Sequence, residues 1–170
     1  MNYKTKIRDF IIFSFLGVLL FLGKMIFEPL PNIHPIGALV MVYTLVYRGR
    51  ALIPIYIFVF LQLFISGFSL WLMPYIYVWT VLWAMTMLLP KNMPLKIQGL
   101  VFPIVCALHG LLFGILYAPM QAILFRMDFP TMLKWIVAGS LFDMVHAAGN
   151  LAAGFLVLPL TLVLKRLSEK

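Results

Sequence analysis

Three polar side chains near the end of the chain have the spacing of one helix face. Asp143, His146 and Asn150 stand at positions i, i+3 and i+7 within an apolar segment, so on an α-helix they point the same way. A carboxylate, an imidazole and an amide offer hydrogen-bond donors and acceptors, and the first two can also transfer protons or bind a metal. Ionisable groups in such a segment are costly unless they face a protein interior, so this face predicts a functional site.

A second set of candidates precedes this polar face in the sequence. His109, Tyr117 and Gln121 lie in the preceding apolar segment, and Tyr75 and Trp79 add flat aromatic surfaces upstream. We expect these side chains to join the polar face in a substrate-binding site that suits a planar polar heterocycle. For His109 alone, packing within the protein interior is the competing interpretation.

The segment from Glu28 to Pro35 combines stiffness with polar side chains. It contains three prolines and three candidate ligand-binding residues: Pro29, Pro31, Pro35, Glu28, Asn32 and His34. Proline fixes one backbone dihedral, so a short connection with three of them is rigid. We interpret this segment as a gating loop over the site. The alternative is a rigid turn whose polar groups are simply solvated.

The composition defines the setting of these residues. The 170 residues are 64% hydrophobic and 11% charged, whereas a soluble domain has roughly 25% charged residues. A soluble globular domain is therefore excluded, and one all-α integral membrane domain over residues 1–170 is predicted. The net charge of +8 comes from basic residues between apolar runs, so it indicates membrane topology rather than nucleic-acid binding. The single cysteine, Cys106, excludes a disulfide framework or a CxxC site.

Apolar runs near the length needed to cross a bilayer, about 20 residues, predict six transmembrane helices. They are Phe10–Phe27, Ile33–Tyr47, Ala51–Leu70, Tyr75–Leu89, Ile97–Phe125 and a last segment within Met132–Leu164. The first is expected to be retained rather than cleaved as a signal sequence.

Basic residues divide ten to three between the two sides of this six-helix arrangement. The ten are Lys4, Lys6, Arg8, Arg48, Arg50, Lys91, Lys96, Lys165, Arg166 and Lys170, and the three are Lys24, Arg126 and Lys134. By the positive-inside rule, both termini are predicted to be cytoplasmic in a multi-pass protein of the cell membrane.

Several intramembrane chemistries lack their motifs. Ser140 is followed by Leu141 and Phe142 rather than by the glycine of a rhomboid-type nucleophile motif. No H-E-x-x-H zinc motif and no Walker A phosphate loop is present in the sequence, and we find no filter loop or charge ring of a channel. Two alternatives stay open: an intramembrane enzyme or metal-dependent hydrolase using Asp143, His146 and His109, and a scaffold whose polar residues only join helices.

Two stretches resemble the substrate-binding S components of energy-coupling factor (ECF) transporters. One is Leu30–Gly37, which enters the second predicted helix, and the other is Gly139–Asn150, which resembles the F-D-x-x-H-x-x-x-N pattern of that family. The six-helix topology with a proline-rich first outer loop extends the resemblance over nearly the whole chain.

The resemblance implies a prokaryotic vitamin-uptake subunit without catalytic activity or cofactor. Such a subunit binds a vitamin or related micronutrient near its outer face, and it docks on a transmembrane T component driven by two cytoplasmic ATPases. Family members often carry an A-x-x-x-A-like docking patch on the first helix. This chain has Ser14, Gly17 and Gly23 there instead, with Gly37-Ala38 as another candidate surface.

Overall fold

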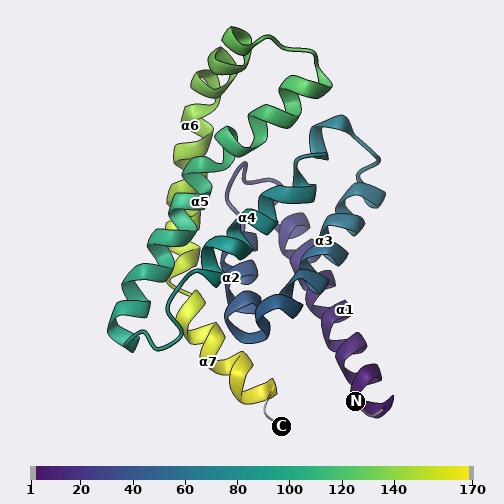
Figure 1. The fold of residues 1–170 in the computed structure, drawn as a ribbon, viewed down its shortest axis with the longest axis vertical. Coiled ribbons are helices and arrows are strands. Elements are labelled where there is room, and N and C mark those ends of the chain that lie inside the picture. The colour runs from purple at the N-terminus through teal and green to yellow at the C-terminus, as the bar shows by residue number, and fades with distance from the viewer. Residues whose placement is uncertain (1–2, 169–170) are drawn as a thin grey trace.

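The computed structural model describes residues 3–168, with side chains from residue 7 onward. This part of the chain consists of helices joined by short connections and contains no β-strand (Figure 1). The helices are α1 (Tyr3–Ile26), α2 (Ile36–Tyr47), α3 (Leu52–Ile65), α4 (Tyr75–Met87), α5 (Leu95–Leu124), α6 (Phe129–Gly154) and α7 (Val157–Ser168), with short 3-10 turns η1 (Arg48–Ala51) and η2 (Leu70–Leu72).

The helices alternate in direction along the chain. α1, α3 and α5 run away from the end of the molecule where α1 begins and α7 ends, and α2, α4 and α6 run back toward it (Figure 1). Contacts agree with this order, because Arg50 at the start of α3 forms an ion pair with Asp9 near the start of α1. An arrangement with both ends of the described chain on one side fits an even number of membrane crossings. Which side is cytoplasmic stays a prediction from the basic residues.

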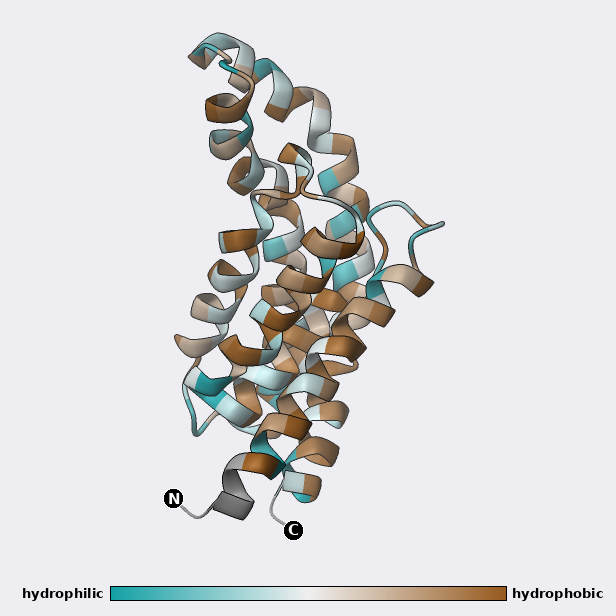
Figure 2. Ribbon diagram, turned by 90° about the vertical axis from the view of Figure 1, so that its right-hand side faces the viewer, coloured by the Kyte–Doolittle hydropathy of each residue, from teal (hydrophilic) through white to brown (hydrophobic). Residues whose placement is uncertain are grey.

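Hydrophobic residues predominate in the helices over most of the height of the molecule (Figure 2). Among the described residues, five helical stretches are long and apolar enough to cross a membrane: Ile7–Ile26, Ile36–Ile65, Leu70–Met87, Leu95–Leu124 and Phe129–Gly154. Large apolar side chains such as Phe10, Phe60, Leu100 and Leu141 point outward and are more than half exposed. Such a surface is stable in hydrocarbon and not in water, so the molecule is a multi-pass membrane protein.

The second of these stretches contains a reversal that separates two of the predicted spans. Its 30 residues include α2, η1 and α3, and Arg48 between them has a positive φ of 55°. The reversal returns α3 alongside α1, where Gly17 packs against Ile57. Each helix is short, with 12 residues in α2 and 14 in α3. Since α2 is buried on almost every side, it needs no lipid-facing length of its own.

The last predicted segment is divided into two helices. α6 ends at Gly154 and α7 begins at Val157, whereas the sequence predicted one continuous segment. Pro159 explains the interruption, because its ring has no N–H to donate to the carbonyl group of Phe155 and would clash with it in a continuous helix. The break lets α7 lean against α2, to which it contributes the buried side chains of Val157 and Thr161.

Candidate functional site

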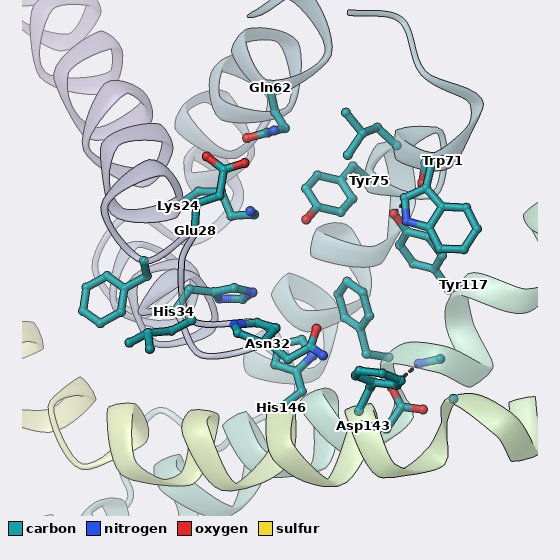
Figure 3. A pocket seen from close by; sticks show the side chains of 18 of the residues that line it. Lys24, Glu28, Asn32, His34, Gln62, Trp71, Tyr75, Tyr117, Asp143 and His146 are labelled. Atoms are coloured by element: carbon teal, nitrogen blue, oxygen red, sulfur yellow. Dashed lines mark hydrogen bonds between the residues drawn. The ribbon is translucent and has the colours of Figure 1, made fainter. Parts of the chain in front are cut away.

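A cavity of about 590 Å³ lies in the half of the molecule away from the start of α1 and the end of α7, and Figure 3 shows it from close by. It is enclosed by the α1–α2 connection, the end of α3, η2, the start of α4, the second half of α5 and the middle of α6. Its lining residues are Lys24, Phe27, Glu28, Leu30, Pro31, Asn32, His34, Gln62, Ser66, Trp71, Leu72, Tyr75, Phe113, Gly114, Tyr117, Trp135, Gly139, Phe142, Asp143 and His146. Small-molecule sites have volumes of roughly 300–1,000 Å³, so the cavity is large enough for such a ligand.

Seven of the residues predicted from the sequence line this cavity. They are Asp143, His146, Tyr75, Tyr117, Glu28, Asn32 and His34. The polar face of α6 and the proline-rich loop therefore meet, although more than a hundred residues separate them in the sequence. Figure 3 shows the His34 and His146 side chains next to each other, with Asp143 farther along α6.

The other four predicted residues lie outside the cavity lining. The Nε2 atom of His109 is 3.0 Å from the carbonyl oxygen of Val78 on α4. The ring of Trp79 is fully buried beneath the cavity, with its centroid 6.1 Å from that of His34. His109 thus joins α5 to α4, and Trp79 joins α4 to His34. Both can support the shape of the cavity without contacting a bound molecule.

Asn150 and Gln121 have partners on neighbouring backbone. Asn150 donates to the carbonyl oxygen of Cys106 over 3.2 Å, and it is 1% exposed. Gln121 donates weakly toward the carbonyl oxygens of Leu70 and Trp71, over 3.4 and 3.5 Å. The shared helix face of Asp143, His146 and Asn150 is therefore correct, but only its first two members reach the cavity.

Asp143 is held by the backbone of α5. Its Oδ1 atom accepts a hydrogen bond of 3.0 Å from the N–H group of Gly114, and the residue is 9% exposed. A side chain at position 114 would collide with this carboxylate. Gly110, one turn earlier, likewise lets α5 approach the backbone of Ala147. Two glycines one turn apart thus bring α5 and α6 into contact at the depth of Asp143.

His146 is the least satisfied polar side chain of the cavity. Both of its ring nitrogens are buried, and neither has a hydrogen-bond partner among the described residues. Its ring packs edge-on against Phe113 and His34, at centroid distances of 4.7 and 5.0 Å. No hydrogen bond joins it to Asp143 within the described chain, so the two residues do not satisfy each other. Unsatisfied buried donors and acceptors cost about 1–3 kcal/mol each, which a bound molecule would recover.

His34 brings the α1–α2 connection onto the site. Its Nδ1 atom is buried without a partner in the described part of the protein. Burial, with a smaller effect from the positive charge of Lys24, lowers the pKa of His34 to about 4. The ring is therefore neutral at physiological pH and presents one donor and one acceptor.

Aromatic rings form the wall between the α5–α6 pair and η2. Phe113 and Tyr117 stack at a centroid distance of 5.2 Å, and the Tyr117 hydroxyl donates to the carbonyl oxygen of Trp71 over 2.6 Å. Trp71 in turn contacts Trp135 edge-on at 6.1 Å. This hydrogen bond and these ring contacts hold the non-helical segment around η2 in place against α5 and α6.

Several lining residues were missed by the sequence reasoning. Trp135 and Gly139 lie eight and four residues before Asp143, so extending the polar face by one and two helical turns would have found them. Lys24 was counted only for topology. Gln62 on α3 and Ser66 directly after it belong to no motif. The Gln62 side chain donates a hydrogen bond to the Ser66 hydroxyl over 2.7 Å, and only their spacing of four could have indicated it.

The proposed ligand set of a metal-dependent enzyme does not come together. In the described residues, no group of three or more His, Cys, Asp or Glu side chains is arranged to hold a metal ion. Asp143 and His146 line the cavity, whereas His109 bonds to α4 on the other side of Trp79. Asp143, His146 and His109 therefore do not form a three-residue metal site in this structure.

Comparison of the chain with protein-family models, curated proteins and solved structures finds no significant match.

Proposed function

We propose that this protein is the substrate-binding S component of an ECF-type importer, which captures a vitamin or related heterocyclic micronutrient. The observation that carries the proposal is the unpartnered imidazole of His146, buried in an aromatic cavity of about 590 Å³. A bound molecule that supplies one acceptor and one donor would satisfy both ring nitrogens. Aromatic walls with few polar groups are typical of small-molecule sites.

The location of the cavity supports capture from outside the cell. The elements that line it lie away from η1, the α4–α5 connection and the start of α5 (Figure 1), whose basic residues the positive-inside rule assigns to the cytoplasm. The α1–α2 connection contributes Glu28, Pro31 and His34 among others to the lining. In this proposal the loop acts as the gate, because it contributes both stiff proline residues and polar side chains to the lining.

Release of the ligand inward requires partners in this proposal, namely a transmembrane T component and two cytoplasmic ATPases. The small residues suggested as a docking patch have other uses within the chain. A side chain at Gly17 would come within 2.5 Å of Ile57, and one at Gly37 within 3.1 Å of Asn150. In this proposal the T component therefore docks on another surface. Ser14 and Gly23 on α1, which are both partly exposed, remain candidates from that set, whereas Ala38 is buried.

Purification of the protein followed by native mass spectrometry and metal analysis tests the proposal. We expect one small organic molecule per chain and no stoichiometric metal. An equivalent of zinc bound to Asp143 and His146, without an organic ligand, would instead support the intramembrane hydrolase.

A further inference from the structure

Resting on the proposed function, we infer that the ligand class is a flat nitrogen heterocycle that carries a positive charge, and that its charged edge lies against Asp143. The inference combines an acidic group without a cationic partner, a set of aromatic faces around it, and open space beside it.

Among the side chains that the structure describes, Asp143 forms no ion pair. Its hydrogen-bond partner is the Gly114 N–H group, and in the described part of the chain the one ion pair is that between Arg50 and Asp9, at the other end of the molecule. A carboxylate at membrane depth is costly without a counter-charge. A cationic ligand supplies one, whereas an anionic ligand would add a second negative charge.

The charges at the opposite side of the cavity do not change this balance. Lys24 and Glu28 both line the cavity near the α1–α2 connection, and Figure 3 shows them together, away from Asp143. One positive and one negative side chain add no net formal charge to that side of the cavity. The lowered pKa of His34 keeps that ring neutral at physiological pH. Asp143 is therefore the acidic lining residue left without an offsetting side chain.

The aromatic residues near Asp143 are suited to a cation. Phe113 and Tyr117 precede and follow Gly114 on α5, and Trp71 and Trp135 extend the same wall. The faces of aromatic rings carry partial negative charge and attract cationic groups, especially where water is excluded. Flat rings also stack on such faces, so a charged heterocycle gains from both interactions.

Space for this ligand lies one turn from Asp143. Gly139 lines the cavity, and a Cβ atom added there would meet no atom within 4 Å. Gly139 thus leaves a gap on α6 between Trp135 and Asp143. A ring that lies in this gap can present its N–H groups to the carboxylate and its face to the aromatic wall.

Three probes of the same size and shape test the inference: benzamidine, benzamide and benzoate, which are cationic, neutral and anionic at neutral pH. Their dissociation constants are measured by saturation-transfer NMR on the full chain in lipid nanodiscs, after removal of any copurified molecule. We expect benzamidine to bind tighter than either of the others by about tenfold or more. In Asp143→Asn, benzamidine and benzamide should bind alike.

Asp128→Asn is the matched control on the same helix. Asp128 caps α6 outside the cavity by accepting from the Thr131 N–H over 2.9 Å, and asparagine caps equally well. This variant should keep the preference for benzamidine. Equal or tighter binding of benzamide or benzoate, no binding of benzamidine, or a preference that persists in Asp143→Asn would each overturn the inference. If Asp143→Asn does not fold, the order of the three probe affinities in the unmodified protein still tests the inference.

The inference about ligand charge and the importer proposal can fail separately. A neutral or anionic copurified molecule whose uptake needs an ECF module would overturn the charge inference and leave the importer. If the protein clearly preferred benzamidine but its ligand entered cells without an ECF module, the importer proposal would be overturned and the charge inference would stand.

Discussion

The carboxylate of Asp143 lies against α5 because residue 114 has no side chain. A Cβ atom there would overlap both carboxylate oxygens, and the Gly114 N–H group is the donor that orients Oδ1. The chemistry of the site thus depends on a residue that carries no functional group. Polar spacing on α6 could be read from the sequence, but this dependence could not, because it involves the contact between two helices.

We predict that Gly114→Ala weakens ligand binding by about tenfold or more, equivalent to about 1.4 kcal/mol. The added methyl group must displace Asp143 from its position. It should also lower the unfolding free energy by about 1–3 kcal/mol through overpacking, partly offset by about 1 kcal/mol of better helix propensity. Affinity for the copurified ligand and thermal unfolding measure both effects.

The matched control is Gly99→Ala, elsewhere on α5. A Cβ atom there would meet a single atom of Leu158 at 3.9 Å, an ordinary contact. Its affinity should equal that of the unmodified protein and its melting temperature should not fall. If Gly114→Ala behaved like this control, the proposed role of Asp143 would be wrong.

At the scale of elements, the site is the junction of the α1–α2 connection with the α5–α6 pair. His34 carries this junction, since its ring contacts His146 on α6 and Trp79 on α4. Protonation of His34 would put a charge into this packed region. The junction should therefore respond to acid.

We predict that stability falls between about pH 6.5 and pH 4. The pKa of His34 is about 4 in the folded protein against 6.5 for an unperturbed histidine, so in this window the unfolded chain takes up a proton that the folded chain does not. The loss reaches at most about 3 kcal/mol at 1.36 kcal/mol per pKa unit. Melting temperatures across this range should drop less for His34→Gln than for the unmodified protein.

Lys24→Gln provides a second check on the same mechanism. The positive charge of Lys24 is the second cause of the lowered pKa of His34, after burial. Its removal should move that pKa upward and shrink the acid-induced loss without abolishing it. Identical pH profiles for all three proteins would mean that His34 does not titrate as described.

Helix-level features were predictable from the sequence to different degrees. The shared face of Asp143, His146 and Asn150 follows from helical periodicity, and all three are buried as that face requires. Which side chains a helix face contacts depends on the angle at which the helices cross and on the height at which they meet. That is why Asn150 ends against Cys106 and His109 against Val78 rather than in the cavity. The break at Pro159 was readable from the residue type but was not predicted.

For the whole molecule, the central feature is the separation of its two ends. The cavity and the proline-rich loop lie toward one end, and the start of α1 and the end of α7 lie at the other, on the same side as η1 with its basic residues Arg48 and Arg50 (Figure 1). If the basic end is cytoplasmic, the cavity faces the cell exterior. The orientation therefore decides whether the protein can capture nutrients.

We predict that a cysteine at position 49 is labelled from the cytoplasm and one at position 68 from outside. Gly49 lies in η1 with open space around it, and Phe68, between α3 and η2, is 70% exposed. Both are tested with membrane-impermeant maleimide on intact cells and on inverted vesicles, and the buried Cys106 serves as the unlabelled background. If the labelling pattern were reversed, the cavity would face the cytoplasm, which would contradict capture from outside.

The most direct test of the importer proposal is uptake of the copurified ligand, in labelled form, by cells that lack any ECF module. Because the sequence has no Walker A nucleotide site, we expect cells expressing this chain alone to bind the ligand at their surface without concentrating it. Coexpression with a T component and its two ATPases should produce uphill accumulation that stops when ATP is depleted. Uphill accumulation by the chain alone would contradict the proposal.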